Sequence, residues 1–77
     1  LGEVDLRGEL ARRIALHRDK LAQYQAIEQR DFLHGRPLPR ELQIQHMILK
    51  KGILYEQASI HWTEEMLGVL EAQATQP

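Results

Sequence analysis

The chain contains no cysteine and few aromatic residues. Without cysteine it can form neither disulfide bonds nor thiolate metal sites to reinforce a small core. Aromatic residues make up 5% of the 77 residues, and a chain this short buries only about 60% of its unfolded surface when it folds. Small domains without such reinforcement often depend on oligomerisation. The sequence therefore predicts one small domain that gains stability from a partner.

The sequence also lacks an excess of either charge and a long apolar run. Lys and Arg number 10 against 11 Asp and Glu, for a net charge of −1, which disfavours a dedicated nucleic-acid surface. No apolar run approaches the roughly 18 residues of a membrane span, and the first residues do not resemble a signal peptide. We expect a cytoplasmic protein that does not bind membranes. Because the sequence starts at Leu1 rather than methionine, we also expect it to be part of a longer chain.

The stretch from Pro39 to Glu71 carries the strongest helical pattern. Proline and an acidic residue, Glu41, both suit the first turn of a helix. At about 100° per residue the apolar side chains of this stretch fall into two stripes on different sides of the helix. The first stripe comprises Ile44, Ile48, Tyr55, Trp62, Met66 and Val69, flanked by Met47, Leu54 and Ala58; the second comprises Leu42, Leu49, Ile53, Ile60 and Leu67. Two stripes predict a helix that is packed on two sides.

A second helical pattern precedes this stretch. Leu10, Ile14, His17, Leu21 and Tyr24 recur at separations of four, three, four and three residues. Between the two patterns, Gly35 suits a left-handed residue, and Pro37 and Pro39 prevent the first helix from continuing. We predict a helix over about residues 4–33, a linker over about 34–38, a helix over about 39–71 and a frayed tail over 72–77. A connection this short makes the helices antiparallel neighbours.

The two stripes determine the predicted assembly. A hairpin covers one stripe, and soluble monomers rarely expose the other. We therefore predict an all-α fold, an antiparallel two-helix hairpin that pairs into a homodimeric four-helix arrangement, with another domain of a longer chain as the alternative cover. The residues expected at the dimer interface are Ile44, Ile48, Gly52, Tyr55, Trp62 and Met66. The residues expected in the hairpin core are Leu10, Ile14, Leu21, Tyr24, Leu49, Ile53, Ile60 and Leu67.

The residues that could carry chemistry do not form a recognisable motif. Di-iron helices need Glu-x-x-His, which is absent, and His61 with Glu64 has that separation in the reverse order. There is no His-Glu-x-x-His, no glycine-rich phosphate loop and no Ser/His/Asp order. We expect no enzyme activity, no metal site and no cofactor. His17 stands where the pattern calls for an apolar residue, so it is a buried polar contact that fixes register, a pH-sensitive contact, or a half-buried histidine with its tip in water.

The second helical stretch resembles a known family. Gly52-Ile53-Leu54-Tyr55-Glu56 followed by Ile60-His61-Trp62-Thr63-Glu64-Glu65 is similar to the C-terminal region of PadR-type bacterial transcriptional regulators. Leu10-Ala11-Arg12-Arg13-Ile14 and Leu21-Ala22-Gln23-Tyr24 resemble the Leu/Ala/Arg-rich helix of the same region. The resemblance spans residues 6–70, and the segment from the glycine to the tryptophan carries most of it.

The resemblance implies the dimerisation half of a regulator whose winged-helix DNA-binding half would precede Leu1. Members of this family form two-fold dimers that place two DNA-reading domains on a pseudo-palindromic site. Some respond to small molecules, including phenolic compounds or drugs, that shift the dimer between states of different DNA affinity. The implied partners are therefore a second copy, DNA through the absent domain, and an effector of unknown identity.

Two other classes of function fit parts of the sequence. A helical adaptor or scaffold that dimerises outside transcription would need the same hairpin. A small all-helical enzyme resembling chorismate mutases would hold a dicarboxylate with arginine and lysine, for which Arg13 and Lys20 are the nearest residues. That fold needs a third helix, which the sequence does not provide, so we expect no such activity.

Overall fold

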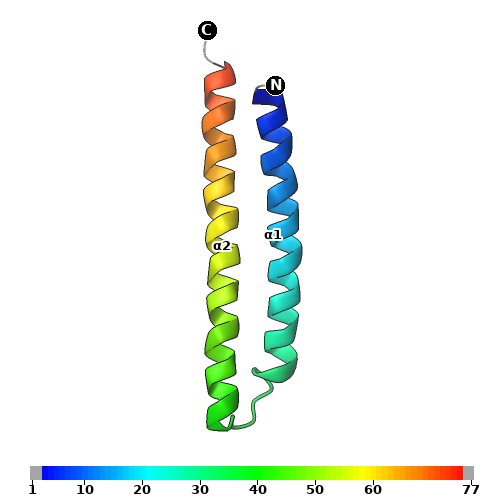
Figure 1. The fold of residues 1–77 in the computed structure, drawn as a ribbon, viewed down its shortest axis with the longest axis vertical. Coiled ribbons are helices and arrows are strands. Elements are labelled where there is room, and N and C mark those ends of the chain that lie inside the picture. The colour runs from blue at the N-terminus through cyan, green and yellow to red at the C-terminus, as the bar shows by residue number, and fades with distance from the viewer. Residues whose placement is uncertain (1–2, 76–77) are drawn as a thin grey trace.

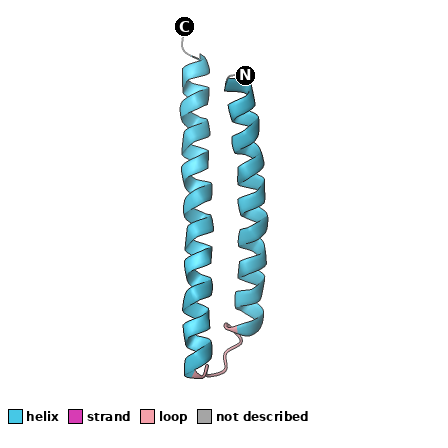
Figure 2. Ribbon diagram, in the orientation of Figure 1, coloured by secondary structure: helices cyan, strands magenta, loops and turns pink. Residues whose placement is uncertain are grey.

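The protein forms two long helices joined by one loop. The computed structural model describes residues 3–75, in which α1 (Glu3–Asp31) and α2 (Arg40–Thr75) lie side by side and antiparallel (Figure 1). The described chain contains no strand (Figure 2) and measures 59 × 17 × 16 Å. The prediction of an all-α fold with two helices packed on each other is confirmed, and the four-helix arrangement of two copies stays a prediction.

Local hydrogen bonds explain where the helices end and begin. The Glu28 carbonyl accepts from both the Phe32 and Leu33 amides at 2.9 Å, which closes the last turn of α1. Gly35 has a φ of +84°, the left-handed conformation that glycine adopts without steric cost. The Pro39 carbonyl then accepts the Gln43 amide at 3.0 Å, and this bond starts α2.

The helix bounds differ from the predicted ones at both carboxyl ends. α1 ends at Asp31 rather than near residue 33, because the paired bonds to Glu28 already close its last turn. α2 continues to Thr75, beyond the expected end at Glu71. Ala72, Gln73 and Ala74 favour helix, and no proline or glycine interrupts them. Of the tail expected to fray, residues 72–75 are helical and residues 76–77 lie outside the described part of the chain.

The helices pack along a single seam. Leu10, Ile14, Ile53 and Leu70 are the apolar residues buried in it. Of the other residues expected in the hairpin core, all are half-buried: Leu21, Tyr24, Leu49, Ile60 and Leu67. Because two helices meet along only one line, most side chains at the seam keep an edge in solvent. Few side chains are therefore fully buried.

Candidate functional site

The most deeply buried side chain in the seam is a carboxylate. Glu56 of α2 is 2% exposed, and its Oε2 lies 2.6 Å from Nδ1 of His17 on α1. His17 is half-buried. Burying a charged or polar group is unfavourable unless a hydrogen bond satisfies it, and His17 supplies that bond. The pair therefore ties the middle of α1 to the middle of α2.

A second histidine–glutamate pair lies near the loop, with the glutamate on α1 and the histidine on α2. Oε2 of Glu28 on α1 lies 2.8 Å from Nε2 of His46 on α2. The His46 ring stacks on Phe32, with ring centroids 4.9 Å apart and ring planes 4° from parallel. This cluster packs the end of α1 onto the start of α2.

Two arginines connect the helices toward the end of the hairpin opposite the loop, which we call the open end. Arg7 Nη2 donates to the Leu70 carbonyl at 2.9 Å, and Arg18 Nη2 donates to Glu64 at 2.6 Å on the exposed surface. An exposed ion pair contributes little stability, whereas the Arg7 bond is partly buried. Together with the histidine pairs, these contacts fix the register of α1 on α2.

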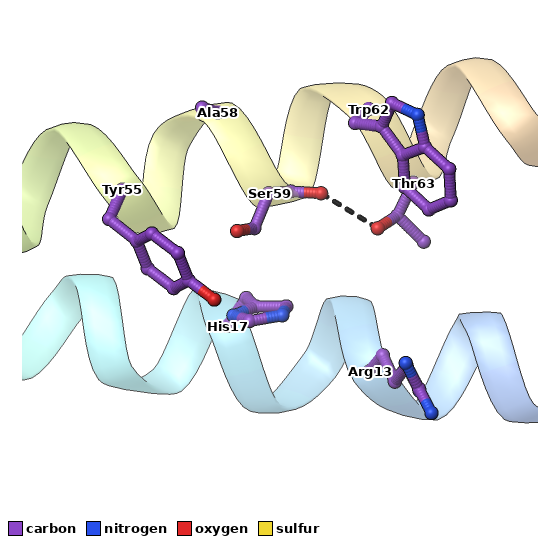
Figure 3. Close-up of a pocket in the computed structure, with 7 residues that line it drawn as sticks. All are labelled: Arg13, His17, Tyr55, Ala58, Ser59, Trp62 and Thr63. Atoms are coloured by element: carbon purple, nitrogen blue, oxygen red, sulfur yellow. Dashed lines mark hydrogen bonds between the residues drawn. The ribbon is translucent and has the colours of Figure 1, made fainter.

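The buried polar residues Glu56 and Thr63 were not identified from the sequence. Both follow an isoleucine of the second stripe by three residues, Ile53 and Ile60 respectively, so they lie on the side of α2 that faces α1. This spacing from the isoleucines is the feature of the sequence that could have identified Glu56 and Thr63 as buried. Thr63 satisfies its hydroxyl within α2 by donating to the Ser59 carbonyl at 2.7 Å, as Figure 3 shows.

The opposite side of α2 is apolar and exposed. We call it the outer face; its apolar residues are Ile44, Met47, Ile48, Leu54, Tyr55, Ala58, Trp62 and Val69. Leu54 is 65% exposed and Trp62 is 59% exposed. At about 100° per residue this face lies roughly 150° around the helix from the residues that contact α1. α1 therefore leaves it uncovered.

The residues expected at the dimer interface occupy three kinds of position. Ile44, Ile48, Tyr55 and Trp62 lie on the outer face, while Met66 is half-buried at its edge. Gly52 faces Tyr24 of the same chain, because a Cβ at this glycine would lie 3.1 Å from Tyr24 Cε2. Gly52 thus makes room for the tyrosine ring within the hairpin.

Two shallow cavities flank the seam beside the outer face. The larger, of about 350 Å³, is lined by Arg13, His17, Tyr55, Ala58, Ser59, Trp62 and Thr63 (Figure 3). In it the Tyr55 and His17 rings meet edge to face, with centroids 6.4 Å apart. The smaller, of about 280 Å³, is lined by Lys20, Tyr24, Ile48, Lys51, Gly52, Tyr55 and Glu56. The larger volume is at the lower end of the range of small-molecule sites, roughly 300–1,000 Å³, and the smaller falls just below that range.

The four histidines have different surroundings. His17 and His46 each pair with a glutamate across the seam, His61 pairs with Glu65 one turn away at 3.0 Å, and His34 Nδ1 accepts the Arg36 amide at 3.1 Å. Within residues 3–75 no group of three or more His, Asp or Glu residues is placed to hold a metal ion. Neither described helix has a segment long and apolar enough to cross a membrane.

Two surface carboxylates have shifted pKa values. Hydrogen bonds from Arg12 and Arg13 lower the pKa of Glu9 below its ordinary value of 4.5. The hydrogen bond from Arg30 lowers the pKa of Asp31 in the same way. Both groups are exposed, so the bonds order the surface of α1 without building a site.

Comparison with known families identifies the hairpin. Residues 1–71 match the family described as virulence activator alpha C-term. The chain belongs to this family. The virulence activator alpha C-terminal domain is a C-terminal domain of PadR-like regulators, which supports the coarser part of the resemblance, a regulator's C-terminal domain. Membership of the PadR family itself stays a prediction. No curated protein and no solved structure matches the chain.

Proposed function

We propose that this virulence activator alpha C-terminal domain dimerises a PadR-like transcriptional regulator and sets the spacing of its two winged-helix DNA-binding domains. The observation that carries the proposal is the outer face of α2, where large apolar side chains such as Trp62 are exposed along the helix. Monomers rarely leave a continuous apolar face of this kind in water. A second copy would cover it and complete a four-helix arrangement.

The hairpin has a shape suited to this role. The N-terminal end of α1 and the C-terminal end of α2 lie together, at the end opposite the loop (Figure 1). A DNA-binding domain joined ahead of α1 would therefore be attached at this open end. Paired hairpins would hold two such domains at a fixed distance, and DNA would be contacted by those domains alone, since the hairpin carries a balanced charge.

An effector would act on the same helices. Tyr55 and Trp62 contribute both to the outer face and to the larger cavity. A small molecule bound there would change how these two side chains pack, and so would favour one arrangement of the dimer over another.

The proposal includes the absence of catalysis, of a metal and of a cofactor, and a cytoplasmic location beside the DNA. Arg13 and Lys20, the residues considered for a dicarboxylate site, line different cavities. A turnover assay with chorismate is expected to give no product above the uncatalysed rate. Product formation that depends on Arg13 would overturn this part.

The experiment that tests dimerisation is sedimentation equilibrium of the 77-residue chain over a wide concentration range. We expect twice the chain mass of 9.0 kDa. Leu54→Glu on the outer face should give the monomer mass, whereas Gln57→Glu, an exposed position off that face, should leave the dimer unchanged. A wild-type monomer at all concentrations would refute the proposal.

The alternative function is a helical adaptor that dimerises outside transcription. It shares the outer face and differs in what is attached to the open end. A helix-turn-helix with a basic recognition helix encoded upstream of Leu1 would support the regulator. A dimeric hairpin with no such domain upstream would support the adaptor.

A further inference from the structure

The spacing of residues along the outer face of α2 is symmetric about its centre. Seven residues follow one another at separations of four, three, four, four, three and four positions: Met47, Lys51, Leu54, Ala58, Trp62, Glu65 and Val69. Separations of three and four place them in one line along a helix. Ala58 is the centre of the line and also lies at the middle of α2 (Arg40–Thr75). Two antiparallel copies centred on Ala58 would therefore overlap along their whole length.

The residues at equal distances from Ala58 are chemically complementary. Lys51 and Glu65 carry opposite charges, and both side chains are exposed. Leu54 corresponds to Trp62, an aliphatic side chain against an aromatic one. Met47 corresponds to Val69, two apolar side chains. In an antiparallel pair each residue meets the one at the equal and opposite position of the second copy, so each of these pairs would form twice.

We infer that two copies of α2 pack antiparallel, with the two-fold axis at Ala58 and with Lys51 of each copy against Glu65 of the other. This inference rests on the proposed dimerisation and specifies its geometry. Glu65 also lies 3.0 Å from His61 of its own helix through Oε1. Since a carboxylate has two oxygens and about four acceptor positions, it can accept a lysine in addition.

Ala58 suits the position on the axis. In Figure 3 its side chain lies on the side of α2 away from α1. On a two-fold axis a residue meets its own copy, so a large side chain there would force the helices apart. A methyl group lets the two helix axes approach closely and lets the longer side chains on either side interlock.

The charges disfavour the parallel alternative. If the two copies of α2 ran parallel, Lys51 would face Lys51 of the second copy, and Glu65 would face the second Glu65. Both contacts would set like charges opposite each other inside an apolar interface, which is unfavourable. The antiparallel arrangement converts both contacts into attractive ones and keeps Leu54 against Trp62.

The inferred register also determines how far apart the open ends lie. Arg7 of α1 contacts the Leu70 carbonyl, so Leu70 marks the start of the open end. Leu70 is a little over three turns from Ala58, which places the two copies of Leu70 roughly 36 Å apart along the helices. The antiparallel register thus places the two open ends, and the domains proposed to be joined there, on opposite sides of the two-fold axis.

Single cysteines test the register directly, because the chain has none of its own. A disulfide requires Cα atoms roughly 4–7 Å apart, and in an antiparallel pair a residue comes this close to its own copy only on the axis. Ala58→Cys should form a disulfide-linked dimer quickly, while Lys51→Cys alone should not, since its two copies would lie roughly 20 Å apart. A mixture of Lys51→Cys and Glu65→Cys chains should cross-link, and Gln57→Cys serves as the control away from the outer face.

Charge exchange gives a second readout by sedimentation. Lys51→Glu and Glu65→Lys should each weaken the dimer by about tenfold or more, and the double variant should regain wild-type affinity because the attractive pairs are restored. Arg12→Glu on α1 makes the same change of net charge as Lys51→Glu but lies away from the outer face, so it should have little effect on the dimer. A dimeric wild type in which Lys51→Cys cross-links as readily as Ala58→Cys, or in which the double variant is no tighter than the single ones, overturns the register alone. A monomeric wild type overturns both this register and the proposed function.

Discussion

His17 and Glu56 hold the two helices together at mid-length through a 2.6 Å contact between Nδ1 and Oε2. Glu56 is the largest fully buried side chain among the described residues, and it comes from a helix whose other seam residues are mostly apolar. A carboxylate buried in this way depends on its partner. The pair makes the alignment of α1 on α2 specific, since sliding either helix by one turn would separate the two groups.

Removal of His17 should therefore destabilise the hairpin. His17→Ala leaves Glu56 buried without its hydrogen bond, and we expect a loss of about 2 kcal/mol in the free energy of unfolding. The double variant His17→Leu/Glu56→Leu should recover most of that loss, because two apolar side chains need no partner. Urea unfolding at one fixed protein concentration measures both. Equal stability of His17→Ala and wild type would contradict the role given to the pair.

Two glycines in α2 should respond differently to alanine. Gly68 has no atom within 4 Å of the position of an added Cβ, whereas Gly52 has Tyr24 Cε2 at 3.1 Å. Gly68→Ala should stabilise the helix by about 1 kcal/mol through helix propensity alone. Gly52→Ala should lose that gain to the collision with Tyr24, and should recover it when combined with Tyr24→Ala. Thermal unfolding of Gly68→Ala, Gly52→Ala, Tyr24→Ala and the double variant tests this. Identical gains at both glycines in the wild-type background would argue against the close approach.

Ile53→Ala and Trp62→Ala separate folding from association. Ile53 is buried in the seam, so its truncation should lower stability by about 2–3 kcal/mol. Trp62 lies on the outer face, so Trp62→Ala should weaken the proposed dimer, and its melting temperature should depend less on concentration than that of the wild type. Calorimetry over a hundredfold concentration range distinguishes them. If the two variants show the same concentration dependence, the outer face does not mediate association.

The hydrogen bonds to Glu9 on α1 predict a contribution to the free energy of unfolding that is lost at acid pH. Arg12 and Arg13 lower the folded-state pKa of Glu9 below 4.5. A carboxyl whose pKa is lowered by folding contributes stability that is present above pH 4.5 and is lost as the pH falls through the folded-state pKa. NMR titration of the Glu9 carboxyl should show the lowered value, and Arg12→Gln should raise it toward 4.5. A Glu9 pKa that Arg12→Gln leaves unchanged would show that this bond is absent in solution.

The periodicity of the sequence was sufficient to predict both helices and the turn. Apolar residues recurring at three and four positions, and the combination of Gly35 with two prolines, act locally and need no knowledge of the partner helix. The double stripe likewise divided the apolar residues of α2 into two sides, although periodicity alone left open which side contacts α1. The extension of α2 to Thr75 was missed because the prediction gave more weight to the lack of apolar residues after Glu71 than to the helix propensity of Ala72, Gln73 and Ala74.

The polar contacts across the seam could not be predicted from periodicity alone. Glu56 stands in line with Ile53 and Ile60, which indicates that it faces α1, but its partner depends on the register of two helices. That register is a property of packing, and several residues of α1 would have reached Glu56 in neighbouring registers. His17 was recognised as unusual, and only the three-dimensional alignment shows which carboxylate it binds.

The contacts across the seam also order the steps by which the chain folds. Glu28 and His46 are 18 residues apart, His17 and Glu56 are 39 apart, and Arg7 and Leu70 are 63 apart. The entropy lost on closing a loop grows with the number of residues it contains, and each contact shortens the loop left for the next. We therefore expect the contacts next to the loop to form first and the helices then to close progressively toward the open end. On this expectation the open end, to which the proposed DNA-binding domain would be joined, forms last and separates first.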